Sequence, residues 1–194
     1  MTGERQGAAV ERQQIVVSGL GGQGVLFVAR LLADAAIRKG AGVLTSETHG
    51  MAQRGGVVVA HLKVGDFESP LVRESRADGL LVLSAENFRL HRRFLAPSGW
   101  AVVNAPPGGL TGGSSRVCAI DADGLAKEFG NLHAINLVLL GYALSGPAGV
   151  EEESPLFCSA EEIREVLRRR MEGKEKLLDA SLAALALGMK HGKR

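Results

Sequence analysis

The amino-acid sequence predicts an α/β fold with a mainly parallel sheet, flanking helices and one inserted β-hairpin. Three observations lead to this prediction: short β-branched runs alternate with longer segments of helical apolar spacing, a glycine-rich turn follows the first strand, and an apolar run stands where a second helix would normally follow. The length of 194 residues is typical of one domain. We therefore expect a disordered tail over residues 1–13 and a single domain over residues 14–194.

The domain is expected to open with a strand, a helix and a second strand. Ile15–Ser18 is a β-branched run, Val25–Ile37 carries apolar residues at helical spacing, and Val43–Glu47 is again typical of a strand. Two further runs, Val57–Val64 and Phe67–Val72, flank a Gly-Asp turn. This arrangement predicts that the two runs pair with each other as the inserted hairpin.

Strands and helices are expected to alternate through the second half. Residues 79–83 and 100–104 are typical of buried strands, with a helix over 85–95 and a turn at 97–99 between them. The Ser-x-x-Glu pattern that begins at Ser159 is a capping box and predicts a charged helix that ends near Met171. The remaining expected elements are a strand at 117–120 and helices at 131–144 and 174–189.

Composition and charge exclude several classes of protein. A formal net charge of +2 and an aromatic content of 4% argue against a nucleic-acid partner. The polar start of the chain and the lack of an apolar run near ~18 residues predict neither a signal peptide nor a membrane span, so we expect a cytoplasmic protein without a membrane partner. Cys118 and Cys158 alone cannot hold an iron–sulfur cluster or a tetrahedral zinc ion, and we expect no metal site.

A glycine-rich loop between the first strand and the first helix is the first candidate site. It fits the pattern G-x-G-x-x-G, and its candidate binding residues are Gly19, Gly21, Gly22, Gln23 and Gly24. Glycines at the positive end of a helix let a phosphate reach backbone N–H groups. Glu47 ends the next predicted strand, where a dinucleotide fold of the Rossmann type holds a ribose hydroxyl. Binding of NAD or FAD and a purely structural turn both remain open.

A second polar segment follows the second predicted strand. Its candidate active-site or interface residues are Glu47, His49, Gln53, Arg54, Gly55 and Gly56. In an open Rossmann-like sheet this segment is expected at the carboxyl ends of the strands, beside the first glycine loop. Arg54, next to two glycines, is suited to bind a phosphate or a carboxylate, although a salt bridge with Glu47 is the alternative.

Two features of the predicted helices leave alternatives open. Asn136 lies in a very apolar helix, so its amide needs hydrogen-bond partners; it either caps a loop of its own fold or reaches the first glycine loop. The last helix carries a narrow apolar seam, which packs either on this chain's own sheet or on a companion subunit. The seam consists of Leu178, Leu182, Leu185 and Met189.

Together the two glycine-rich segments resemble the gamma-type subunits of 2-oxoacid:ferredoxin oxidoreductases. Within that family, Thr48-His49-Gly50-Met51 is most similar to the small (beta) subunit of indolepyruvate ferredoxin oxidoreductase. The resemblance covers about residues 14–189 and extends through Ser69-Pro70-Leu71, the segment 78–84 and the segment 136–141.

The resemblance implies an accessory subunit of a larger oxidoreductase. Thiamine diphosphate and [4Fe-4S] clusters are then expected on a large companion subunit, with ferredoxin as electron acceptor and coenzyme A as a co-substrate that this chain contacts. The oxidised 2-oxoacid would be indolepyruvate or another aryl pyruvate. Gly65-Asp66-Phe67 departs from the thiamine-diphosphate motif, so we expect no cofactor and no catalytic residue on this chain alone. A free-standing NAD- or FAD-binding protein and a small homodimeric binding protein are the alternatives.

Overall fold

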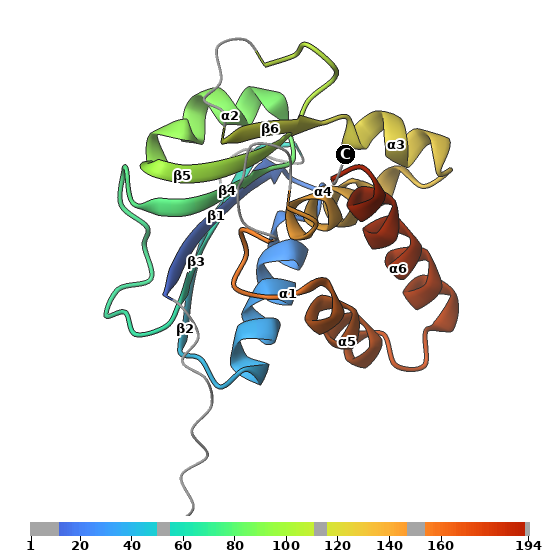
Figure 1. Cartoon of the computed structure of the whole chain (residues 1–194), viewed down its shortest axis with the longest axis horizontal. Helices are drawn as coiled ribbons and strands as arrows, with labels where there is room; N and C mark the ends of the chain where they lie inside the picture. Colours follow the sequence, from blue (N-terminus) through green and yellow to red (C-terminus); the bar gives the residue numbers. More distant parts are fainter. Residues whose placement is uncertain (1–11, 50–54, 111–115, 147–153, 193–194) are drawn as a thin grey trace, which may run out of the picture.

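The computed structural model describes residues 12–49, 55–110, 116–146 and 154–192. These residues form a six-stranded sheet in the order β2-β3-β1-β4-β5-β6 (Figure 1). The expected tail, 1–13, lies outside the described residues except at its end, where Gln13 is already the first residue of β1. The strands are β1 Gln13–Leu20, β2 Val43–His49, β3 Val57–Val64, β4 Ala77–Val82, β5 Leu95–Asn104 and β6 Val117–Ile120.

The sheet is mixed, with its parallel part running from β1 through β4 and β5 to β6. β3 lies between β1 and β2 and is antiparallel to both. β1 and β2 therefore point the same way, as a strand-helix-strand unit requires, but they are not neighbours. The predicted α/β class with a mainly parallel sheet is confirmed, and the inserted hairpin is formed by β2 and β3.

The pairing predicted for that hairpin was wrong. Val57–Val64 does not pair with Phe67–Val72, which forms no strand. Leu62 and Val64 are buried in one face of the sheet while Val59 and His61 are buried in the other, so this segment is a central strand that needs two neighbours. Pro70 interrupts the second run and has no N–H to donate to a ladder.

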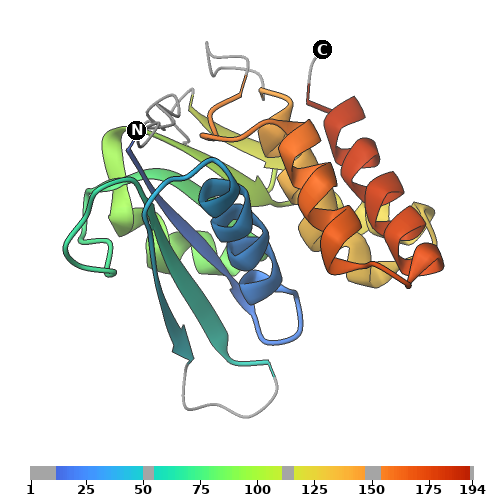
Figure 2. The same cartoon turned by 90° about the horizontal axis from the view of Figure 1, so that it is seen from below.

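Helices cover the two faces of the sheet unequally. Figure 2 shows the long helices on one side, where their apolar residues share a core with Ile15, Val17 and Leu81. α2 lies on the other face with a short 3₁₀ turn, over Val16 and Leu80. The helices are α1 Val25–Arg38, α2 Ala85–His91, α3 Ala122–Glu128, α4 Ile135–Leu144, α5 Ala160–Arg170 and α6 Glu175–Lys190, and the 3₁₀ turns are Arg92–Phe94 and Leu132–Ala134.

Two local expectations need correction. β5 begins at Leu95 and continues through the expected turn at 97–99, because a register shift opposite Ala77–Gly79 accommodates Pro97. α3 was not predicted; its seven residues are too few for a clear apolar period, and Asp121 caps it by accepting from the Gly124 N–H at 2.8 Å. The capping box at Ser159 is confirmed, since Ser159 and Glu162 bond each other reciprocally.

The C-terminal helix packs on its own chain. α6 crosses α4 where Gly188 faces the Val138 carbonyl and Gly141 faces the Leu185 carbonyl, both too close for a Cβ atom. Leu185 of the predicted seam is fully buried there. At Leu185 the seam therefore packs on α4. Within the described ranges, no helix is long and apolar enough to cross a membrane.

Candidate functional site

The first glycine loop links β1 to α1 and is closed by its own glutamine. The Leu20 N–H donates to Gln23 Oε1 at 2.7 Å, and the Gln23 N–H donates to the Leu20 carbonyl at 3.1 Å. A Cβ at Gly19 would lie 2.8 Å from Gln23 Oε1 and 2.9 Å from Val25 Cγ2. Gln23 and Gly19 thus shape the loop rather than offer free groups to a ligand.

The end of the loop presents the N-terminus of α1 without a side-chain cap. Gly24 is the N-cap in the left-handed region, with φ +85°, and the first turn carries no acidic residue. Gly22, with φ +96°, is exposed and has open space where a Cβ would stand. In the part of the chain that the structure describes, the N–H groups of Gly22 and Gly24 have no partner. They lie at the positive end of the helix and suit an anion.

The second glycine-rich segment meets the first, as predicted. The Gly21 N–H donates to the Gly56 carbonyl at 2.8 Å, and β3 begins at the next residue, Val57, opposite Leu20. Gly55 is exposed and left-handed, with φ +102°. His49 ends β2 opposite Val58. The predicted residues Gln53 and Arg54 lie outside the described residues, between these two anchored ends.

Glu47 does not stand where a dinucleotide fold needs its acidic residue. β3 separates β2 from β1, which places Glu47 two strands from the first glycine loop, about 10 Å in the hydrogen-bonding direction. Its carboxylate pairs with Arg30 of α1 at 3.8 Å. Glu47 therefore does not occupy the position from which the acidic residue of a Rossmann-type fold holds a ribose hydroxyl.

Asn136 reaches the first glycine loop, the second of the two alternatives considered for it. It is buried at the start of α4, and its Nδ2 lies where a Cβ at Gly24 would stand. Its Oδ1 accepts from the Leu137 N–H at 2.7 Å. Gly24 is consequently required both by its backbone angle and by this contact.

An apolar groove begins at Asn136, and no local sequence pattern predicts it, because its walls come from four separate elements. Its volume is about 220 Å³. Phe27 in the first turn of α1 lines the groove, which places the groove beside the glycine loop. Its other lining residues are Asn131, His133, Ala134, Leu137, Met171, Leu177, Ala180, Ser181 and Ala184.

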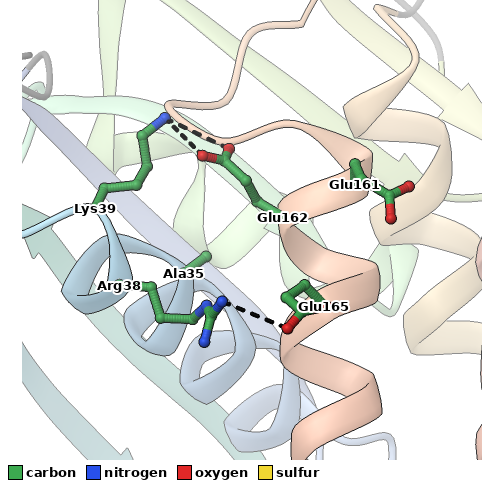
Figure 3. A pocket seen from close by; sticks show the side chains of 6 residues that line it. All are labelled: Ala35, Arg38, Lys39, Glu161, Glu162 and Glu165. Atoms are coloured by element: carbon green, nitrogen blue, oxygen red, sulfur yellow. Dashed lines mark hydrogen bonds and ion pairs between the residues drawn. The ribbon is translucent and has the colours of Figure 1, made fainter.

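A second cavity, of about 320 Å³, lies between the C-terminal half of α1 and α5 (Figure 3). Its charged side chains pair across the gap: Lys39 Nζ lies 3.2 Å from Glu162 and Arg38 lies 3.6 Å from Glu165. Lys39 also donates to the Phe157 carbonyl at 2.9 Å. These ion pairs join α1 to α5 and leave both basic side chains of the cavity already paired.

Where the structure describes the chain, the cysteines and histidines form no candidate metal site. Both thiols are buried, and burial raises the pKa of the Cys158 thiol to about 12, so that it stays protonated at neutral pH. Across the described ranges, no group of three His, Cys, Asp or Glu side chains is placed to hold an ion.

Comparison with known proteins identifies relatives over most of the chain. Residues 14–191 match the family model of pyruvate ferredoxin/flavodoxin oxidoreductases. The indolepyruvate oxidoreductase subunit IorB of Archaeoglobus fulgidus is 33% identical over 200 residues, which cover 91% of this chain and 94% of that subunit.

Two solved structures share the fold. The gamma subunit of a keto/oxoacid ferredoxin oxidoreductase from Geobacter sulfurreducens has a TM-score of 0.71 at 22% identity, and the match covers 92% of this chain and 97% of that one. The 2-oxoglutarate:ferredoxin oxidoreductase of Magnetococcus marinus, solved with 2-oxoglutarate, coenzyme A and succinyl-CoA, has a TM-score of 0.72 at 24% identity, over 93% of this chain and 31% of that one. The chain therefore belongs to the pyruvate ferredoxin/flavodoxin oxidoreductase family, in which its relatives are the small subunits of larger oxidoreductases.

Proposed function

We propose that this chain is the accessory, gamma-type subunit of a cytoplasmic 2-oxoacid:ferredoxin oxidoreductase. A large companion subunit would carry thiamine diphosphate and [4Fe-4S] clusters and pass electrons to ferredoxin. The residues of this chain do not fit an iron–sulfur cluster, because it has two cysteines and both are buried. Its contribution is then to complete one wall of a shared site.

The observation that carries the proposal is the junction of the two glycine-rich loops. The bond from Gly21 to Gly56 joins the two loops beside the open N-terminus of α1, two residues after Arg54 in the sequence. The N–H groups of Gly22 and Gly24 and the Arg54 guanidinium are suited to bind the phosphates of coenzyme A. The groove that starts at Asn136 offers an apolar surface next to that anion site.

The companion subunit would bind the 2-oxoacid itself. Several relatives are named as indolepyruvate oxidoreductase subunits, which supports indolepyruvate or another aryl pyruvate as the substrate. On this chain the residues act by binding and by excluding water, and none transfers a proton or an electron. The product would leave as an acyl-CoA.

The test uses the complex of this chain with its companion, purified without oxygen and assayed for iron and thiamine. Gly22→Ala keeps the N–H but strains a backbone with φ +96°, which should shift that N–H and raise the KM for coenzyme A about tenfold, the effect of weakening one hydrogen bond to a charged group. Arg54→Ala is expected to raise the same KM.

Gly173→Ala is the matched control. Gly173 has φ +74° and open space around a Cβ, like Gly22, but it lies in the turn between α5 and α6. Both alanines therefore strain a backbone position of positive φ, and only the one at position 22 should change the KM. An unchanged KM in Gly22→Ala and Arg54→Ala would remove this site from coenzyme A binding. Tight binding of NAD or FAD by the chain alone would instead favour a free-standing nucleotide-binding protein.

A further inference from the structure

A cluster of buried polar side chains lies beneath α2, on the face of the sheet away from the long helices. The α2 cluster consists of Ser18 of β1, His61 of β3, and Asn87 and His91 of α2. Their exposed fractions are 0%, 4%, 1% and 7%. None of them belongs to the candidate site, although Ser18 directly precedes the first glycine loop.

Contacts within the cluster fasten α2 and the 3₁₀ turn to the sheet. Ser18 Oγ and His91 Nδ1 lie 2.7 Å apart. The Phe94 ring meets the His61 ring edge-on at a centroid distance of 5.3 Å and stacks on His91 at 6.1 Å. Both imidazoles thus contact the Phe94 ring, and through it they link residues 85–94 to β1 and β3.

The α2 cluster contains buried polar atoms without hydrogen-bond partners, and the charged groups near it are cations. Within the described residues, His61 Nδ1 and Asn87 Nδ2 are buried without a hydrogen-bond partner. The charged groups that act on the imidazoles, apart from one another, are Lys63 of β3 and Arg93 of the 3₁₀ turn. Ser46, opposite His61 on β2, is uncharged.

Further from the imidazoles, the charges that act on Lys63 are also cations. They are Arg12, before β1, and Arg73, in the loop before β4. Arg93 pairs with the carboxylate of Glu74 at 3.4 Å, which is exposed rather than part of the cluster. A proton added to either imidazole would therefore bring a positive charge into a buried site next to other positive charges.

We propose that residues 85–94 form a pH-sensitive clamp, which neutral His61 and His91 hold on the sheet and which opens locally when they are protonated. Opening would expose Val16 and Leu80 and release Ser18 at the base of the first glycine loop. The clamp is independent of the function proposed above.

The direction of the effect follows from linkage between protonation and opening. Burial is the main cause that lowers the pKa of His61, helped by His91 and Lys63; burial and Arg93 lower the pKa of His91, against a backbone hydrogen bond at Asn87 that raises it. An imidazole that opening exposes to water, whether His61 on β3 or His91 in the segment itself, has an ordinary pKa of about 6.5. The open form therefore binds protons that the closed form excludes. Closure is fully favoured above about pH 6.5 and weakens as the pH falls toward the folded values.

Hydrogen exchange of the full chain, followed by mass spectrometry between pH 7.5 and 5, tests the clamp. After correction for intrinsic exchange, the protection of residues 85–94 should fall by up to about 100-fold per pH unit if two protons are bound on opening. His61→Gln or His91→Asn should reduce that slope to about tenfold, whereas His133→Gln, at an exposed position, should leave it unchanged.

Low urea concentrations separate local opening from global unfolding. At pH 5.5, exchange in residues 85–94 should hardly respond to urea, while exchange in α4 should accelerate with it. The proposal is overturned if both segments respond equally, or if protection at 85–94 is independent of pH. Should the variants fail to fold, the NMR titration of the wild-type imidazoles decides: a pKa above 6.5 at both His61 and His91 contradicts the clamp, and values below it support the clamp.

Discussion

At the scale of single residues, the packing of Gly24 against Asn136 fixes the start of α1. The glycine pattern was readable from the sequence, because a G-x-G-x-x-G between a strand and a helix predicts backbone angles that favour glycine. The contact of Gly24 with Asn136 could not be predicted from the sequence in the same way. Asn136 follows Gly24 by more than a hundred residues, and its contact depends on α4 lying beside α1, which is a property of the tertiary structure.

We expect Gly24→Ala to destabilise the protein by about 2–5 kcal/mol, the sum of a strained backbone and an overpacked contact. Gly40→Ala is the control, since Gly40 ends the same helix with φ +79° and has open space. It should cost only about 1–2 kcal/mol. Urea denaturation measures both. Adding Asn136→Ala to Gly24→Ala should recover part of the loss, and strict additivity of the two changes would contradict the contact.

At the scale of elements, features that depend on one segment were predicted correctly, whereas the pairing of strands and the packing of helices were not. The capping box at Ser159 and the helix expected over Val25–Ile37 follow from neighbouring residues, and both are confirmed. The partner of Val57–Val64 was wrong because strand pairing depends on segments far apart in the sequence. The apolar seam of α6 showed which face is buried, but it could not show that α4 covers that face.

The crossing of α4 and α6 leads to a prediction for that pair of helices. Alanine normally stabilises a helix relative to glycine by about 1 kcal/mol. At Gly188, however, its Cβ would overlap the Val138 carbonyl, so Gly188→Ala should instead destabilise the protein by about 1–3 kcal/mol. Ala186→Leu adds bulk on the exposed side of the same helix and should change stability by less than about 0.5 kcal/mol. Thermal unfolding of the two variants would decide; equal melting temperatures would refute the close crossing.

At the scale of the whole molecule, the side chain of Gln13 joins the start of β1 to the segment before α5. Gln13 Nε2 donates to the Pro155 carbonyl at 2.6 Å, and the Phe157 N–H donates to Gln13 Oε1 at 3.0 Å. The sequence placed this residue in the tail, because a polar residue before a β-branched run carries no signal of a partner about 140 positions away. Its two bonds connect the start of the sheet to the segment that leads into α5.

Gln13→Ala should therefore lower the free energy of unfolding by about 1–2 kcal/mol and loosen the segment before α5. Gln14→Ala provides the comparison, because the side chain of Gln14 has no hydrogen bond within the described ranges and should matter little. Limited proteolysis between residues 147 and 160, together with urea denaturation, would measure the effect. Equal behaviour of the two variants would show that the Gln13 bonds do not join the two regions.

The position of β3 between β1 and β2 has a consequence for how the family can vary its chemistry. Gln53 and Arg54 lie in the sequence between β2 and β3, which pair with each other, and β3 also pairs with β1. Changes of length or sequence between two paired strands leave the register of the sheet untouched. The residues between β2 and β3 can therefore be exchanged, in evolution or by design, to change the groups that the proposed shared site contains. The fold of the protein would stay the same.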